Sequence, residues 1–276
     1  MPWSREELLS IVRRSPERVA AHDREGWLDL FSADAVVEDP VGAAPNPRAR
    51  LGRFYDTFIA GNTIDFEVRE DLVAGVEVVR DVVLHTRLST GLEIAVPAHL
   101  LYEIADEGGA PKIRRLRAIW DLRRRSRGAL AAGLPGLWTL TVVSGQMLRR
   151  QGLGGVLGYS RGLVSGIFGR GPAAIGRLAA AIEAGDPAAV EGLFVDGAAV
   201  ESPIGVTKTP AEWIAGLGAG ARLVVADATP AGWLTSFRFA ITGGAAAGQG
   251  GVAIAAFDPR RRGIAGLRFF TRDPPP

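Results

Sequence analysis

The chain carries the same short sequence pattern twice, 163 residues apart. In each copy an apolar, helix-like stretch leads into an acidic segment with a proline and a glycine, and no gap is needed to align the two. The paired positions are Phe31 with Phe194, Glu38 with Glu201, Pro40 with Pro203, Gly42 with Gly205 and Pro47 with Pro210. A period of domain size predicts two copies of one fold rather than a solenoid.

Each copy begins with helical periodicity. Apolar residues recur at helical spacing over about 6–31 and about 175–194, and second helices are predicted at 51–59 and 210–217. Segments rich in β-branched and apolar residues follow in the first copy, at 64–72, 76–88, 93–104 and 112–122. Helices followed by a run of strands predict α+β domains with an antiparallel sheet.

The length and the repeat together predict three parts. A chain of 276 residues suits two domains. We expect the first domain at 1–125, a basic, glycine-rich helical hairpin as linker at 126–171, and a second, degenerate domain of the same fold at 172–276.

Composition excludes several classes of function. The chain has no cysteine and only three histidines, so no disulfide, no thiolate metal centre and no other metal site is expected. The N-terminus lacks an apolar signal-peptide core, which predicts a cytoplasmic location. The net charge of +2 conceals a basic middle, because residues 122–182 hold nine arginines and no acidic residue. The acidic flanks argue against nucleic acid as a partner.

Four short motifs carry a family resemblance: VVEDPVG at 36–42, RFY at 53–55, VP at 96–97 and LRAIWD at 116–121. Over about 6–121 the chain resembles the ketosteroid isomerase branch of the NTF2-like (SnoaL-like) superfamily. The resemblance implies a cone-shaped α+β fold, in which a curved sheet wraps helices around one deep apolar pocket. It implies no cofactor, and it is compatible with a homodimer. The second copy resembles the superfamily more weakly.

The resemblance implies that Asp39 is the catalytic base. In such enzymes this carboxylate moves a proton on a carbon next to a carbonyl, while hydrogen-bond donors hold the enolate oxygen. An apolar pocket raises the pKa of a carboxylate and so suits it to this task. The alternative interpretation is that Asp39 merely starts a turn before Pro40.

The donors of the family are replaced in this sequence. The catalytic tyrosine of the family falls at Ser15, which is too short to reach the pocket centre. The protonated aspartate of the family falls at His99, a candidate catalytic donor, or at Leu100 if the strand register is shifted by one residue. These two assignments exclude each other, because neighbouring residues of a strand face opposite sides. Further substrate-pocket candidates are Trp27, Phe54, Tyr55 and Trp120.

The second copy lacks the base. Ser202 stands at the position of Asp39, and the strand expected to match His99 offers no polar side chain. We therefore predict that the second domain does not catalyse proton transfer, and that it packs or binds an apolar ligand.

The middle segment has two unusual features. Residues 128–148 are uncharged, and glycine then recurs at every fourth position, at Gly154, Gly158, Gly162 and Gly166. Glycine costs about 1 kcal/mol of helix propensity, so such a helix is expected only where its glycine face packs closely or lies in lipid. One interpretation is a hairpin on an anionic membrane surface, reached through 123–177. The alternatives are a hairpin packed between the domains and a mobile linker.

The sequence thus predicts proton transfer (enolisation) on a lipophilic carbonyl compound, such as a steroid or polyketide, at a membrane surface. A non-catalytic lipid-binding or scaffold protein is the first alternative. An epoxide hydrolase or cyclase is the second, and it would require another carboxylate facing Asp39, for which Glu67 and Asp71 are the candidates.

Overall fold

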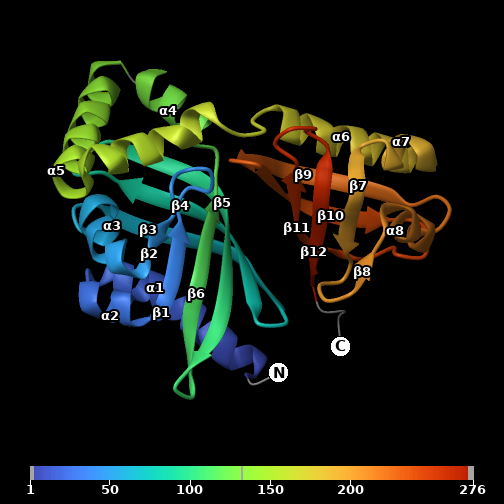
Figure 1. Ribbon diagram of the computed structural model, residues 1–276, viewed down its shortest axis with the longest axis horizontal. Helices are drawn as coiled ribbons and strands as arrows, with labels where there is room; N and C mark the ends of the chain where they lie inside the picture. The colour runs from blue at the N-terminus through green and yellow to red at the C-terminus, as the bar shows by residue number, and fades with distance from the viewer. Residues whose placement is uncertain (1–2, 132, 273–276) are drawn as a thin grey trace. The chain divides into compact units, whose positions relative to one another are not determined.

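The computed structural model describes residues 3–131 and 133–272, and it divides into two compact units. The first unit is Met1–Ser165 and the second is Gly166–Pro276. Both combine helices with a six-stranded sheet (Figure 1), which confirms the predicted α+β fold class and its tandem arrangement.

In the first unit, three helices precede or lie between the strands of one sheet. The helices are α1 (Arg5–Ala20), α2 (Arg24–Asp29) and α3 (Leu51–Phe58), the last preceded by a short 3-10 turn. The strands are β1 (Phe31–Glu38), β2 (Asn46–Pro47), β3 (Thr63–Ala74), β4 (Glu77–Arg87), β5 (Glu93–Glu107) and β6 (Ala110–Ile119). Their order is β2-β1-β6-β5-β4-β3. The β1–β6 pair is parallel and all other pairs are antiparallel, so the sheet is mixed rather than purely antiparallel.

Local sequence explains where α1 begins and which face it buries. Ser4 and Glu7 form a capping box, which satisfies free backbone N–H groups at the start of the helix. Leu8, Ile11 and Val12 then recur at helical spacing and are buried. These residues belong to the hydrophobic core of the first unit, together with residues of its sheet.

Two further helices follow β6 and belong to the first unit. They are α4 (Leu122–Ala131) and α5 (Leu134–Val164), and α5 bends at Gly152, whose φ of 71° is not helical. The helix α5 packs against α3 and α4. A hydroxyl–hydroxyl hydrogen bond of 2.7 Å between Thr90 and Thr139 fixes its first half, and Arg123 Nε donates to the Leu163 carbonyl at 2.7 Å near its end. Within the described residues, no helix combines the length and apolarity needed to cross a bilayer.

The second unit repeats the architecture of the first. Its helices are α6 (Arg170–Glu183), α7 (Pro187–Glu191) and α8 (Pro210–Leu217). Its strands are β7 (Phe194–Glu201), β8 (Thr207–Lys208), β9 (Arg222–Ala231), β10 (Leu234–Thr242), β11 (Gly250–Phe257) and β12 (Ile264–Thr271). The strand order β8-β7-β12-β11-β10-β9 matches that of the first sheet, including the parallel pair between β7 and β12.

The structural repeat follows the sequence repeat only in part. The strands β1 and β7 coincide over their whole length at the offset of 163 residues. The predicted equivalence of Pro47 and Pro210 is wrong, because Pro47 lies in β2 while Pro210 begins α8. The loops that follow Gly42 and Gly205 differ in length. The offset of 163 residues therefore does not hold for the elements that come after these loops.

Candidate active site

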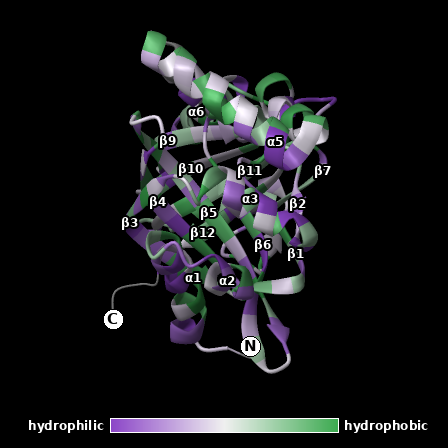
Figure 2. Ribbon diagram, turned by 90° about the vertical axis from the view of Figure 1, so that its left-hand side faces the viewer, coloured by the Kyte–Doolittle hydropathy of each residue, from purple (hydrophilic) through white to green (hydrophobic). Residues whose placement is uncertain are grey.

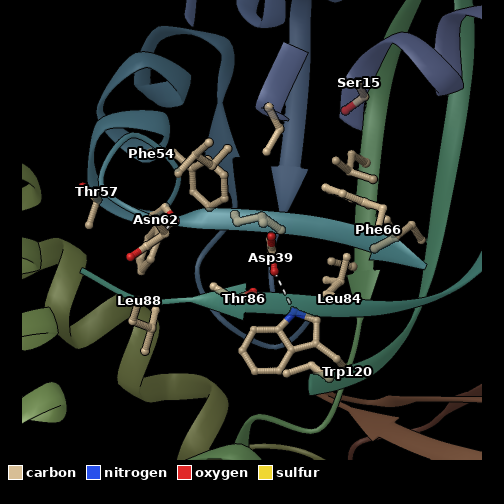
Figure 3. Close-up of a pocket in the computed structure, with 18 of the residues that line it drawn as sticks. Ser15, Asp39, Phe54, Thr57, Asn62, Phe66, Leu84, Thr86, Leu88 and Trp120 are labelled. Atoms are coloured by element: carbon tan, nitrogen blue, oxygen red, sulfur yellow. Dashed lines mark hydrogen bonds between the residues drawn. The ribbon is translucent and has the colours of Figure 1, made fainter. Parts of the chain in front are cut away.

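A mostly apolar cavity of the first unit is lined by residues of its helices and of its sheet (Figure 3). Aliphatic and aromatic side chains form most of the wall. The polar residues of the wall are Ser15, Asp39, Thr57, Asn62, Thr86, Ser89, Tyr102, Trp120, Arg125, Gln146 and Tyr159. A cavity of this composition suits a lipophilic molecule with a small number of polar groups.

Asp39 stands on the wall of this cavity, directly after β1. The indole Nε1–H of Trp120 donates a hydrogen bond to Asp39 Oδ1 at 2.7 Å (Figure 3). Burial raises the pKa of Asp39, while the bond from Trp120 and the positive charge of Arg125 act in the opposite direction. The guanidinium of Arg125 lies 5.1 Å from the centroid of the Trp120 ring. The site thus holds a carboxylate that is more basic than usual in a fixed orientation.

Tyr102 and Ser15 meet at one end of the cavity. Tyr102 projects from β5 and Ser15 from α1, at the position where the family resemblance places a catalytic tyrosine. Burial raises the pKa of Tyr102 to about 12, and the hydrogen bond with Ser15 opposes this rise. The phenol therefore stays protonated at neutral pH and can donate a hydrogen bond. Sequence reasoning missed Tyr102 as a donor, although the alternation of β5 places it on the same face as Leu100.

His99 lies on the other face of β5. It is 3% exposed, and its Nε2 is 3.8 Å from Asp81 Oδ1. Leu100 lines the cavity instead. The partners of His99 in the sheet are Asp81 of β4 and Ile119 of β6. The structure therefore separates His99 from Asp39.

The aromatic candidates divide into two groups. Trp27 and Phe54 line the cavity together with Trp120. Tyr55 is buried beside Trp27, with 5.5 Å between the ring centroids, and is not among the lining residues. The cavity wall thus brings together Asp39, Trp27, Phe54 and Trp120.

The two other carboxylate candidates lie outside the cavity. Glu67 pairs with His85 at 2.8 Å on the exposed side of β3. Asp71 accepts two hydrogen bonds of 2.8 Å from the buried guanidinium of Arg80. Among the described residues that line the cavity, Asp39 is the one carboxylate. A pair of carboxylates acting on opposite sides of an epoxide is therefore not assembled from these residues.

Four lining residues come from α4 and α5, and all of them except Arg125 fall in the segment 126–171 that the sequence predicts as a linker. They are Arg125, Val143, Gln146 and Tyr159. The only sequence signal for this placement was the glycine at every fourth position, which indicated close packing without identifying the partner.

A large aromatic side chain replaces a small one at an equivalent wall position of the second unit. Val37 pairs with Leu116 in the first sheet, as Val200 does with Leu267 in the second. Two residues further on, Ala118 of the cavity wall therefore corresponds to Phe269.

Aromatic rings occupy the interior of the second unit. The ring of Phe269 lies 5.2 Å from that of Trp213 and 4.8 Å from that of Phe239. The same strand register equates Trp120 with Thr271 and Tyr102 with Ala255. With Ser202 at the position of Asp39, the second unit lacks counterparts of the base, its indole donor and the phenol.

Residues 12–115 match the SnoaL-like domain. Through this segment the chain belongs to the SnoaL-like (NTF2-like) family, as the four motifs predicted. No match was found among curated protein sequences.

Several solved structures are similar to the chain over half of its length or less. Delta 5-3-ketosteroid isomerase from Mycobacterium sp. is 30% identical, with 42% of this chain and 94% of that chain covered and a TM-score of 0.38. The protein RV0760c from Mycobacterium tuberculosis, in complex with estradiol-17beta-hemisuccinate, is 30% identical, with 42% and 95% covered and a TM-score of 0.39. An epoxide hydrolase of the LEH-like type from M. tuberculosis is 17% identical, with 50% and 96% covered and a TM-score of 0.40.

Proposed function

We propose that the first unit catalyses proton transfer on a lipophilic ketone, with Asp39 as the proton carrier. The observation that carries the proposal is the Asp39 carboxylate on the wall of an apolar cavity, oriented by Trp120 and facing a space that a substrate can fill. Family membership supports the same assignment. Steroids and polyketides are the substrate classes that the family resemblance suggests.

The proposed reaction needs only the substrate, the carboxylate of Asp39 and the phenol of Tyr102, and no proton is gained or lost overall. Asp39 takes a proton from the carbon next to the carbonyl, and the electron pair of the broken C–H bond moves to the carbonyl oxygen as an enolate. The phenol of Tyr102 donates a hydrogen bond to this oxygen, backed by Ser15. Asp39 then returns the proton to a second carbon of the conjugated system, and the carbonyl forms again. The net result is movement of a double bond.

The direct test is conversion of a 5-ene-3-ketosteroid by the full chain, followed as the absorbance of the conjugated enone. Turnover with saturable kinetics is the expected result. Tight binding of the steroid without conversion would favour the alternative class, a non-catalytic lipid carrier.

The pH dependence of this reaction tests the role of Trp120. The base must be ionised to act, so kcat/KM falls as the pH drops through the pKa of Asp39. Because the bond from Trp120 lowers that pKa, Trp120→Phe raises it, and the fall begins at a higher pH. A hydrogen bond to a charged group contributes about 1.5–3 kcal/mol, so we expect about a tenfold loss of activity on the acid side. The plateau at high pH changes less.

The matched control is Trp27→Phe, which alters another tryptophan of the same wall. Its pH profile should keep the wild-type midpoint. A Trp120→Phe profile that moves to lower pH, or does not move, would contradict the proposed role of the indole donor.

The outer surface of α5 supports a second function, reversible binding to an anionic membrane. Leu153, Leu157 and Val164 are 71%, 70% and 76% exposed and recur on one side of the helix. Figure 2 shows hydrophobic residues on the turns of α5. Arginines share the segment, which has no acidic residue between Asp121 and Glu183. Exposed leucines beside arginines are the chemistry of an interfacial helix on anionic lipid.

Vesicles of phosphatidylserine and phosphatidylcholine test this function. The full chain is expected to sediment with them at low salt and to be released by high salt. Burial of one leucine contributes about 1.5–3 kcal/mol, so the double change Leu153→Ser and Leu157→Ser should weaken binding by tenfold or more. The control Val206→Ser with Val224→Ser changes exposed valines of the second unit. Equal binding by both double variants would exclude α5 as the lipid contact.

A further inference from the structure

The helical extension after β6 forms part of the cavity although it lies outside the matched family segment. The match ends at residue 115. Arg125 of α4 and three residues of α5 nevertheless line the same cavity as Asp39, the three being Val143, Gln146 and Tyr159. The substrate site of this chain is therefore larger than the family domain.

The repeated glycines explain how α5 comes so close to the base. A Cβ atom on Gly158 would lie 2.6 Å from the Cβ of Ala44, and one on Gly162 would lie 3.3 Å from the Ala43 nitrogen. The Ala44 N–H donates a hydrogen bond of 2.9 Å to the Gly158 carbonyl. The second half of α5 thus packs directly on the loop that follows Asp39. This close approach requires a glycine at position 158, because any larger side chain would collide with Ala44.

This packing directs Tyr159 inward. Its ring stacks on that of Phe58, with 5.7 Å between the centroids and 22° between the planes. Tyr159 also lines a smaller adjoining pocket together with Asp39 and Arg53. Burial raises the pKa of Tyr159, while Arg125 lowers it and Asp39 raises it further. The phenol is therefore a protonated hydrogen-bond donor at neutral pH.

The cavity has phenols toward both of its ends. Ser15, which hydrogen-bonds Tyr102, marks one end, and Thr57 and Asn62, close in sequence to Phe58, mark the other (Figure 3). Asp39 and Trp120 lie between them (Figure 3). A steroid-like molecule whose reacting carbonyl binds at Tyr102 would extend past Asp39 toward Phe58 and α5.

We infer that Tyr159 contacts the substrate and donates a hydrogen bond to an oxygen at the end remote from the reacting carbonyl. The substrate class is then an elongated lipophilic ketone with a second oxygen at its far end. This inference rests on the proposed function, because the position of the reacting carbonyl is taken from it.

A pair of ligands isolates this contact. The ligands are a 4-ene-3-ketosteroid with a 17-keto group and the analogue without oxygen at that carbon. Binding is measured by quenching of tryptophan fluorescence, since Trp27 and Trp120 line the cavity. The wild type should prefer the 17-keto steroid. Tyr159→Phe should weaken binding of that steroid about three- to tenfold, as expected for one neutral hydrogen bond, and leave the analogue unchanged.

Two further variants serve as a negative and a positive control for this result. Trp138→Phe alters an aromatic residue of α5 that is 63% exposed, and it should leave both affinities unchanged. Gly158→Ala should displace α5 from Ala44 and reproduce the ligand-specific loss. In turnover assays with the two corresponding 5-ene substrates, Tyr159→Phe should raise KM for the 17-keto substrate and leave kcat unchanged.

The outcomes separate this inference from the proposed function. If Tyr159→Phe weakens both steroids equally, or neither, Tyr159 is only part of the wall and the inference is wrong. Wild-type binding that does not distinguish the two steroids, or binding of neither, also overturns it. Absence of enone formation by the wild type, together with the ligand-specific loss in Tyr159→Phe, would overturn proton transfer and leave the contact standing.

Discussion

Asp39→Asn is expected to lower kcat for 5-ene-3-ketosteroid conversion by about 10²–10⁴-fold, the usual contribution of a positioned general base. Asparagine has the shape of aspartate and can still accept the hydrogen bond from Trp120. It cannot take up a proton from carbon at neutral pH. The cavity keeps its volume and loses a charge, so steroid binding should persist or improve.

The matched control for this change is Glu38→Gln. Glu38 is the neighbouring residue, and the substitution removes the same charge. Its carboxylate lies 3.3 Å from Arg115 and 3.5 Å from Arg117 and is not among the cavity residues. We expect turnover within about twofold of the wild type, as for a surface pair of small energetic weight. Enone formation at the wild-type rate in Asp39→Asn would exclude Asp39 as the proton carrier.

Asp39→Asn also separates the two classes of function for this cavity. A carrier protein binds its ligand through apolar area and shape, so the substitution would leave its ligand and affinity almost unchanged. For an enzyme, binding and turnover respond in opposite ways. Measuring both on one preparation decides whether the carboxylate acts on the ligand or only lies beside it.

The fold could be predicted from the sequence because its signals are local. Apolar spacing identified the helices and strands, and the motif around Asp39 recurred at a constant offset through β1 and β7. The parallel pairing of β1 with β6 could not be predicted in this way. Those strands lie far apart in sequence, and no residue pattern in either strand indicates whether its partner runs parallel or antiparallel to it.

The site was harder to predict than the fold, for two physical reasons. One residue of strand register decides whether His99 or Leu100 faces the cavity, and the sequence alone left both open. The second reason is that glycines on a helix indicate close packing but do not show which part of the chain packs against them. The partner of Gly158 is the loop at Ala44, more than a hundred residues earlier in the chain.

The difference between the two units suggests how such a cavity is lost. Both have the same strand order, but the equivalent wall carries a larger side chain at one position of β12 than at the matching position of β6. Ala118 leaves space beside Leu100 and Leu116, whereas Phe269 fills it and packs on Trp213. The contents of the interior, rather than the topology, thus distinguish a unit with a binding cavity from one with a packed core.

This comparison leads to the second large effect, which is loss of ligand binding in Ala118→Phe. Ala118 is 1% exposed and lies on the cavity wall. A phenylalanine there should occupy the space of the steroid rings, as Phe269 does in the second unit. We expect steroid affinity to fall at least 100-fold and turnover to fall with it, although Asp39, Trp120 and Tyr102 are unchanged.

Stability distinguishes a filled cavity from a damaged fold. Overpacking of a filled core costs about 1–3 kcal/mol, whereas a ring that enters empty apolar space gains contacts. The melting temperature of Ala118→Phe should therefore stay close to the wild-type value or rise. Ala118→Ser, which adds little volume, should keep both binding and turnover, and Ala118→Val should be intermediate. Wild-type affinity in a folded Ala118→Phe variant would mean that the ligand binds elsewhere, and that the cavity around Asp39 is not the active site.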